Sequence, residues 1–192
     1  MFRCFFTDRF SLEEEGVKMK EIEAAIRNIP DFPSPGIQFK DITPLLANAE
    51  LFAKTIDQFK ALHPAGSVDM VVGIEARGFV FASALACALG AGTTLLRKPG
   101  KLPAAVFRET YDLEYGTDAL EIHADAFLPG QRVLLIDDLL ATGGTVRAAL
   151  DLIRKNFEVE LVGVDVLIEL CFLNGREQLK GVPVQALVQY EA

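Results

Sequence analysis

The sequence predicts an α/β fold with a mainly parallel central sheet flanked by helices. Two short apolar runs, Met70–Ile74 and residues 133–136, contain no charged residue, which is typical of strands buried on both faces of a parallel sheet. Each run is followed by polar residues and then by a segment predicted to be helical. Strands and helices that alternate in this way along a chain indicate this fold class.

Length and composition are those of one globular domain. The chain has 192 residues, of which 51% are hydrophobic and 24% charged, so it can bury a full core. The formal net charge is −8. Lys and Arg supply most of the affinity for nucleic-acid phosphates, and in this chain acidic residues outnumber them. We therefore expect no nucleic-acid partner.

Residues 1–18 differ from the rest of the chain. Their aromatic cluster is interrupted by Asp8 and Arg9, and it has neither the apolar stretch nor the small-residue cleavage site of a signal peptide. We expect a dispensable, disordered extension that arises from an upstream start codon, followed by the folded domain over residues 19–192.

The first part of that domain combines helices with a turn. Apolar residues keep helical spacing over residues 19–28, and Pro30 is predicted to stop this helix. Pro and Gly within residues 33–36 then force an extended, turning segment. Residues 51–62 again show helical spacing and predict an amphipathic helix.

The run Met70–Ile74 predicts a buried strand that ends in a turn at residues 75–78. Ligands of parallel α/β sheets bind beyond the carboxyl ends of the strands, so Arg77 in this turn is a candidate binding cation. A solvated turn arginine is the alternative.

The next segment, residues 78–96, carries no charge over a length that could span a membrane. Gly90 and Gly92 interrupt it, however, and small residues dominate where a span would use Leu and Ile. A core helix to about Leu89 followed by a strand over residues 93–96 explains the segment better. We therefore expect no membrane partner.

Lys98 and Lys101 flank a turn just after that strand. Two lysines on a turn are usually solvated, but a diphosphate ligand needs cations beyond those that a single loop supplies. Residues 107–116 are polar and aromatic and end in glycine, the composition of a mobile flap. Further strands are predicted over residues 120–127, 161–169 and Val184–Tyr190.

A strand, a loop and a helix over residues 133–156 carry the clearest chemistry. The strand over residues 133–136 ends in Asp137 and Asp138, and the helix that follows has one apolar face. The loop between them consists of Ala141, Thr142, Gly143, Gly144 and Thr145. Its glycines let the backbone approach a ligand, and unpaired N–H groups at the helix start can bind phosphate.

The two acids beside this loop can accept hydrogen bonds from vicinal hydroxyls, as acids do on ribose in dinucleotide folds. The expected ligand is therefore a ribose 5-phosphate unit. The alternative is that Asp137 and Asp138 cap a helix and that the glycines form an ordinary turn. A P-loop NTPase is excluded because the chain contains no G-x-x-x-x-G-K-[ST] motif.

Cysteine and histidine residues show no metal-site pattern. Cys4, Cys87 and Cys171 are widely spaced, and neither His63 nor His123 has a partner at ligand spacing. We interpret the thiols as buried or incidental in a reducing cytosol, which predicts a cytoplasmic protein. We assign no role to either histidine.

The segment 133–145 resembles the phosphoribosyl pyrophosphate signature of the type I phosphoribosyltransferases. Four further stretches resemble the adenine phosphoribosyltransferases, in the same order: residues 32–42, 73–79, 97–103 and 113–116. The similarity runs from about Met19 to the C-terminus. Five motifs in series are more specific than any one of them.

The resemblance implies a type I phosphoribosyltransferase fold with a small N-terminal hood and a mobile flap. The implied reaction transfers the 5-phosphoribosyl group from phosphoribosyl pyrophosphate to adenine, forming AMP and pyrophosphate in purine salvage. It also implies Mg²⁺ held mainly by substrate oxygens, with no direct protein ligand, and a homodimer.

Roles for single residues follow from the same resemblance. Glu114, in the flap, is implied as the acid/base on the purine, and an ordinary exposed glutamate is the alternative. Arg77 is implied as a second catalytic residue that acts on the departing pyrophosphate. The implied substrate-binding residues are Ile37, Phe39, Arg77, Lys98, Lys101, Tyr115, Asp137, Asp138, Ala141, Thr142, Gly143, Gly144 and Thr145.

Three other readings stay open. A sister enzyme could use hypoxanthine, guanine, xanthine or orotate, and would differ only in the base pocket around residues 32–39. A regulator could keep the phosphoribosyl pyrophosphate site as a sensor, but residues 1–18 are too few for a nucleic-acid-binding module. A structural or interaction domain leaves the five motifs unexplained.

Overall fold

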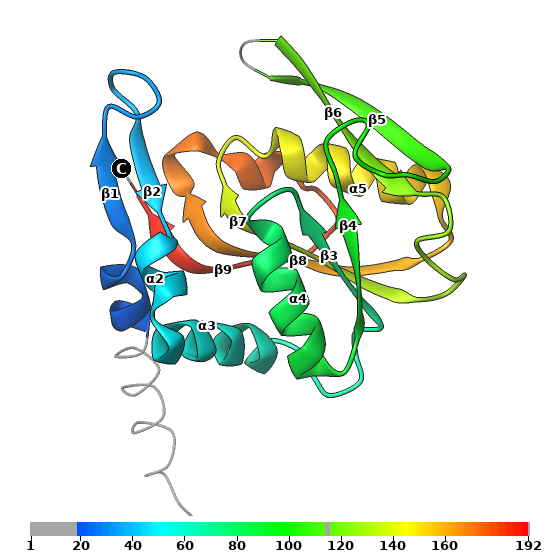
Figure 1. Cartoon of the computed structure of the whole chain (residues 1–192), viewed down its shortest axis with the longest axis horizontal. Coiled ribbons are helices and arrows are strands. Elements are labelled where there is room, and N and C mark those ends of the chain that lie inside the picture. The colour runs from blue at the N-terminus through cyan, green and yellow to red at the C-terminus, as the bar shows by residue number, and fades with distance from the viewer. Residues whose placement is uncertain (1–18, 114–115, 192) are drawn as a thin grey trace, which may run out of the picture. The chain divides into compact units, whose positions relative to one another are not determined.

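The computed structural model describes residues 19–113 and 116–191 (Figure 1). The predicted extension over residues 1–18 and the flap residues Glu114 and Tyr115 lie outside the described residues. The chain forms two compact units, Met1–Gln58 and Phe59–Ala192. Within the described residues, every helix is too short or too polar to cross a membrane.

The first unit contains a short antiparallel strand pair that was not predicted. Residues 19–24 are helical, and the strand β1 (Arg27–Pro30) then pairs with β2 (Gln38–Asp41). The prediction of a helix to residue 28 was therefore wrong. Arg27 lies opposite Asp41 in this pair and donates from Nε to its carboxylate at 3.0 Å, a contact between distant residues that helical spacing cannot show.

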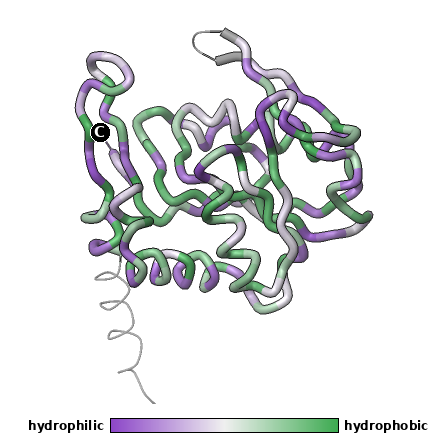
Figure 2. The backbone as a smooth tube through the Cα atoms, viewed as in Figure 1, coloured by the Kyte–Doolittle hydropathy of each residue, from purple (hydrophilic) through white to green (hydrophobic). Residues whose placement is uncertain are grey.

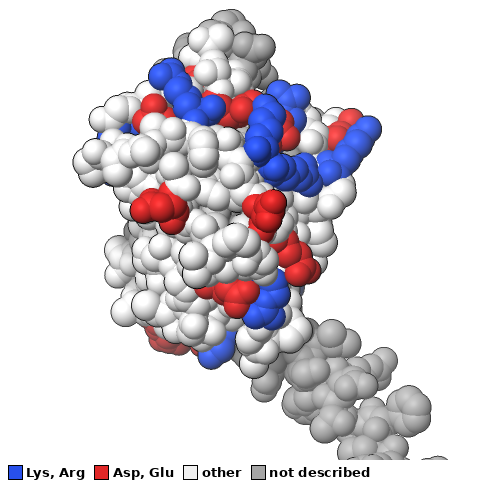
Figure 3. Space-filling view, turned by 90° about the vertical axis from the view of Figure 1, so that its right-hand side faces the viewer, with Lys and Arg blue, Asp and Glu red and all other residues white. Residues whose placement is uncertain are grey.

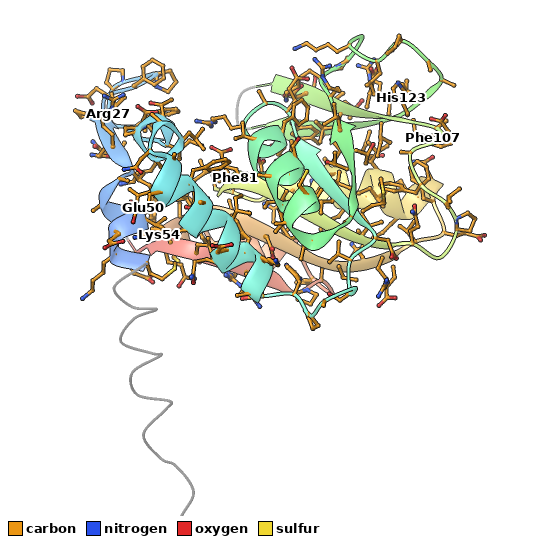
Figure 4. The ribbon with its side chains drawn as sticks, turned by 60° about the horizontal axis from the view of Figure 1, so that its bottom comes forward. Arg27, Glu50, Lys54, Phe81, Phe107 and His123 are labelled. Carbon is orange, nitrogen blue, oxygen red and sulfur yellow. The ribbon has the colours of Figure 1, made fainter. Side chains whose placement is uncertain are left out.

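Two helices follow in this unit, α2 (Thr43–Ala47) and α3 (Ala49–Ala61), the second close to its predicted limits. The side chain of Asn48 accepts hydrogen bonds from the backbone N–H groups of Glu50 and Leu51, both at 3.1 Å, and so caps α3. Hydrophilic and hydrophobic residues alternate along α3 (Figure 2). Lys54 of α3 contacts Glu50 at 2.9 Å (Figure 4) and Glu21 at 2.8 Å.

The second unit is built on a five-stranded sheet whose strands are all parallel, which confirms the predicted mainly parallel sheet. Its strands lie in the order β4-β3-β7-β8-β9. Their bounds are Met70–Ile74 for β3, Gly92–Leu96 for β4, Arg132–Leu140 for β7, Glu160–Leu170 for β8 and Val184–Tyr190 for β9.

The strand β7 is longer than predicted. It does not end at the two acids but continues to Leu140, because its pairing with β8 continues from Asp137, opposite Val166, to Leu140, opposite Glu169. Asp137 and Asp138 are therefore strand residues, and their backbone is fixed by the sheet. The loop after them is correspondingly shorter.

Helices cover both faces of this sheet. Val72 and Ile74 of β3 belong to the same core as α5 (Gly144–Asn156). Gly73 lies between them in sequence and faces α4 (Gly78–Leu89), where a Cβ would come within 2.8 Å of Ala82. Because successive strand residues point to opposite faces, α4 and α5 pack on opposite sides of the sheet.

The predicted flap is part of a β-hairpin. The strands β5 (Val106–Leu113) and β6 (Gly116–His123) pair antiparallel, with Val106 opposite His123 at the base (Figure 4). The strand predicted over residues 120–127 thus begins earlier and ends at His123, where a turn follows.

On the face of the molecule drawn in Figure 3, basic and acidic side chains lie next to one another in the upper part.

Candidate active site

A pocket of about 250 Å³ lies at the carboxyl ends of β3 and β7 in the second unit. Its walls come from the turn after β3, the end of β7 and the start of α5. The lining residues that the sequence predicted as binding residues are Arg77, Lys98, Asp137, Asp138, Ala141, Thr142, Gly143, Gly144 and Thr145. This is the edge of the sheet at which ligands of parallel α/β folds bind.

The phosphate loop, residues 141–145, leads directly into α5. Gly143 has a φ of +87° and precedes the first residue of the helix, Gly144. The first N–H groups of an α-helix have no partner within the helix, and the helix dipole favours an anion at this end. The loop therefore has the backbone geometry of a phosphate site.

The wall behind this loop was missed by the sequence analysis. The short 3₁₀ helix η2 (Gly175–Gln178) places the backbone of Gly175 against Ala141 and Gly143. A Cβ on Gly143 would overlap the carbonyl oxygen of Gly175, and a Cβ on Gly175 would overlap that of Ala141. The dipeptide Asn174-Gly175 signals a turn, but not its contact with the loop.

An ion pair holds this wall in place. Arg176, the residue after Gly175, donates to both carboxylate oxygens of Glu169 at 2.5 and 2.7 Å and to the carbonyl of Val184 at 2.7 Å. Glu169 is buried in β8 and also accepts a hydrogen bond from Gln189 at 2.9 Å. A bidentate pair of this kind fixes the orientation of both partners.

The two acids of β7 are close together and have perturbed titration. Asp138 is buried, Asp137 is partly buried, and the backbone N–H of Asp138 donates to the carboxylate of Asp137 at 2.9 Å. Burial and the neighbouring Asp138 carboxylate raise the pKa of Asp137 well above its ordinary value. Burial also raises the pKa of Asp138, although Arg77, whose Nε lies 2.9 Å from its carboxylate, opposes that shift.

Three cations form what we call the cation wall, Arg77, Lys98 and Lys101, and each contacts a carboxylate. Arg77 pairs with Asp138, Lys98 with Asp118 of β6, and Lys101 with Glu75. Lys98 lines the pocket, whereas Lys101 is not a lining residue but contacts Glu75, which is. The cations predicted from the sequence are thus gathered on one side of the pocket.

Glu75 contacts several residues in and beside this wall, and no role was predicted for it from the sequence. It accepts a hydrogen bond from the backbone N–H of Lys98 at 2.7 Å and another from Nε of Arg97 at 3.2 Å, besides its contact with Lys101. Burial raises the pKa of Glu75, but the hydrogen bonds outweigh burial and lower it to about 2. Glu75 is therefore a carboxylate at neutral pH.

The four remaining predicted site residues lie in the first unit or outside the described residues. Ile37 and Phe39 belong to the first unit, where the ring of Phe39 lies 5.1 Å from that of Phe32 and Ile37 is 46% exposed. Glu114 and Tyr115 lie outside the described residues. Their roles stay predictions.

One histidine has a partner that was not predicted. His63 lies with Nε2 2.7 Å from the carboxylate of Asp165, a fully buried residue of β8. Burial raises the pKa of Asp165, and the hydrogen bond with His63 opposes this shift. The pair lies outside the residues that line the pocket.

The chain is similar over most of its length to known phosphoribosyltransferases. The family model described as "Phosphoribosyl transferase domain" matches residues 39–180. The adenine phosphoribosyltransferase of Chloroflexus aurantiacus is 54% identical over 176 residues, which cover 89% of this chain and 98% of that protein.

Solved structures give the same result. The adenine phosphoribosyltransferase of Thermoanaerobacter pseudethanolicus superimposes with a TM-score of 0.85 at 48% identity, over 90% of this chain and 99% of that one. The Saccharomyces cerevisiae enzyme, solved with an iminoaltritol bisphosphate and adenine, gives 0.85 at 41% identity, over 90% and 99%. The chain therefore belongs to the phosphoribosyltransferase family, among the adenine phosphoribosyltransferases.

Proposed function

We propose that the protein transfers the 5-phosphoribosyl group from phosphoribosyl pyrophosphate to N9 of adenine, forming AMP and pyrophosphate. The observation that carries this proposal is a single pocket that combines a backbone phosphate loop, two carboxylates at a strand end and a wall of cations. Relatives that this chain matches over nearly their whole length are named for the same reaction.

The phosphate loop and the two acids would hold the sugar phosphate. The N–H groups of residues 143–145 and the hydroxyls of Thr142 and Thr145 suit the 5-phosphate. Asp137 and Asp138 would accept hydrogen bonds from the ribose hydroxyls. Positive charge develops on the ribose ring as pyrophosphate leaves, so these carboxylates would also stabilise the transition state.

The cation wall would neutralise the leaving group. Arg77 and Lys98 line the pocket, and Lys101 joins them through Glu75. Burial lowers the pKa of Lys98, but its contacts with Asp118 and Tyr111 outweigh burial and raise it, so the amine keeps its charge. An incoming pyrophosphate group would exchange places with the carboxylates that now contact these cations.

The base would be held by residues of the hood and the flap. The resemblance supports Ile37 and Phe39 as purine contacts, Tyr115 as a further substrate contact and Glu114 as the acid/base on the purine.

Glu114→Gln should lower kcat by about 100-fold, the usual contribution of a positioned general acid, and should change the KM for either substrate far less. The control Glu158→Gln changes an exposed glutamate, and it should leave kcat unchanged. Unchanged turnover in Glu114→Gln would remove Glu114 from the mechanism.

Mg²⁺ would enter as a complex with the substrate. Within the described residues, no group of three or more His, Cys, Asp or Glu side chains could hold a metal by itself. The carboxylates at the pocket, Asp137 and Asp138, are assigned to the ribose hydroxyls, so Mg²⁺ would keep substrate and water oxygens as its ligands. When bound, the metal would withdraw charge from the diphosphate.

The assembly and location of the protein also remain proposals. The resemblance supports a homodimer in the cytoplasm and a domain that needs only residues 19–192. Light scattering at micromolar concentration should give twice the mass of one chain for the full protein and for a chain that begins at Met19. Loss of folding or activity in the shorter chain would show that the extension is not dispensable.

The direct test of function is a single-turnover assay with phosphoribosyl pyrophosphate and Mg²⁺ against adenine, hypoxanthine, guanine and orotate. We expect AMP from adenine and no nucleotide from the other bases. Product from another base alone would identify a sister enzyme. Tight binding of phosphoribosyl pyrophosphate without any product would favour the sensor.

A further inference from the structure

The hydroxyl of Tyr111 lies at a junction between the two parts of the pocket. Tyr111 is a residue of β5 and is 6% exposed. Its hydroxyl accepts hydrogen bonds from Nζ of Lys98 at 3.3 Å and from Oγ1 of Thr145 at 3.4 Å, and it donates to the carboxylate of Asp118 at 3.2 Å. These contacts use its one donor and both of its acceptor positions.

The three partners come from three different elements. Thr145 belongs to the phosphate loop and the first turn of α5, and Lys98 follows β4 in the cation wall. Asp118 lies directly opposite Tyr111 in the β5–β6 hairpin and also contacts Lys98. The hairpin is thereby connected to both sides of the pocket through one hydroxyl group.

We propose that Tyr111 and Asp118 are positioning residues that couple binding of the 5-phosphate to binding of the pyrophosphate. This proposal rests on the proposed function, which assigns Thr145 to one group and Lys98 to the other. A 5-phosphate that takes the hydroxyl of Thr145, or a pyrophosphate that takes the amine of Lys98, withdraws a donor from Tyr111. The first ligand bears the cost of disturbing this network, so the second binds more tightly.

The same contacts hold the β5–β6 hairpin against the pocket. Release of Lys98 from Asp118 frees the hairpin from one of its contacts with the pocket wall. Binding of the complete substrate at both positions would therefore release the hairpin most fully. Coupling through Tyr111 would favour the intact diphosphate over either fragment.

The test measures coupling directly, with ribose 5-phosphate and inorganic pyrophosphate as separate ligands. The dissociation constant of pyrophosphate is measured by calorimetry with Mg²⁺, without and with saturating ribose 5-phosphate. The ratio of the two constants is the coupling factor. We expect a factor roughly fivefold larger in the native protein than in Tyr111→Phe, within the usual range of coupling between sites. Any direct repulsion between the ligands is common to both proteins.

Two further variants make the result specific. Asp118→Asn keeps the shape of the side chain but removes its charge, and it should lower the coupling factor in the same direction. Tyr190→Phe changes a tyrosine of β9 that is not among the residues lining the pocket, and it should leave the factor unchanged. A merely structural role for the hydroxyl would lower the melting temperature of Tyr111→Phe without changing the coupling factor.

The outcomes separate this proposal from the proposed function. Equal coupling factors in the native protein, Tyr111→Phe and Asp118→Asn would overturn the coupling role, even if the native protein makes AMP. If Tyr111→Phe does not fold, Asp118→Asn alone decides in the same way. Binding of both fragments without AMP formation from adenine would refute the proposed function and leave the coupling measurable.

Discussion

The phosphate loop and the cation wall present hydrogen-bond donors to the pocket in two different ways. The loop offers backbone N–H groups whose positions are fixed by a helix start, by Gly143 at positive φ and by Gly175 packed behind it. The cation wall offers side chains that already contact carboxylates, namely Asp138, Asp118 and Glu75. The loop is a preformed site, whereas each cation must exchange one anion for another.

This difference suits the reaction. The 5-phosphate stays attached to the sugar from substrate to product, so a rigid site costs nothing during turnover. Pyrophosphate must leave after each reaction, and the carboxylates proposed to take its place would lower the cost of its departure. Changes to the loop should therefore act through geometry, and changes to the wall through charge.

The largest effect is expected for Gly175→Ala. The new Cβ would overlap the carbonyl oxygen of Ala141 and displace the phosphate loop. Because a displacement of about 1 Å can cost about 100-fold in rate, we expect kcat/KM for phosphoribosyl pyrophosphate to fall by about that factor. Steady-state kinetics would measure this loss.

The control for this change is Gly163→Ala, a strand glycine whose added Cβ would make only ordinary contacts at 3.6 Å. It should keep its activity within about twofold, as expected for a substitution without a clash. Native activity in Gly175→Ala would show that the wall behind the loop is not needed.

A smaller effect is expected for Lys98→Met. The substitution keeps much of the side-chain length but removes the charge, so the KM for phosphoribosyl pyrophosphate should rise about tenfold, the equivalent of 1.4 kcal/mol. The KM for adenine should stay the same. The native KM should also rise with added salt, and the variant should lose part of this dependence.

Lys180→Met changes an exposed lysine and serves as the matched control, with unchanged kinetics expected. If Lys98→Met raised the KM for adenine instead, Lys98 would belong to the base site and not to the pyrophosphate site.

The cation wall should also resist acid. The pKa of Glu75 is lowered from 4.5 to about 2, so its ion pairs stabilise the folded state above pH 4.5 and lose this contribution as the pH falls towards 2. Glu75→Gln should therefore unfold more easily than the native protein from pH 7 to 5, by a constant amount. Urea unfolding at several pH values should show the difference shrinking below pH 4.5, and a difference independent of pH would contradict this account.

The smallest effect is expected for the stability of Asp137→Asn. The pKa of Asp137 is raised in the folded protein, so the ionised side chain lowers stability at neutral pH and its protonation restores stability as the pH falls. Asparagine removes the charge and should raise the melting temperature by roughly 2 to 4 °C, the shift expected for 1 kcal/mol in a domain of this size.

This gain in melting temperature should shrink at acidic pH. The activity of Asp137→Asn should fall, because the variant loses the carboxylate proposed to accept hydrogen bonds from the ribose hydroxyls. Asp125→Asn, at an exposed position, should change neither property. A lower melting temperature in Asp137→Asn at pH 7 would show that the charged form is stabilised by contacts that outweigh burial.

The sequence predicted the parallel sheet because β3 and residues 133–136 of β7 are continuous apolar runs. Met70–Ile74 and Val184–Tyr190 were placed at their observed limits, and the fold and family are confirmed. The two acids and the glycines of the loop were singled out by the same local reasoning, because an apolar run precedes them and a helical pattern follows.

Features that depend on distant partners were not predictable. β1 forms because Arg27 meets Asp41 across a turn, and β7 runs past its acids because β8 continues beside it. Gly175 acts on the phosphate loop from beyond β8, and Glu75 gathers donors from a separate turn. Local composition carries no signal for such contacts.

The most direct test of the division between the two regions is the binding of ribose 5-phosphate and of pyrophosphate, each alone, to the native protein, Gly175→Ala and Lys98→Met. Calorimetry should show that Gly175→Ala weakens ribose 5-phosphate and retains pyrophosphate, and that Lys98→Met does the reverse. If each variant weakened both ligands equally, or if the pattern were exchanged, the assignment of the loop to the 5-phosphate and of the wall to the pyrophosphate would be wrong.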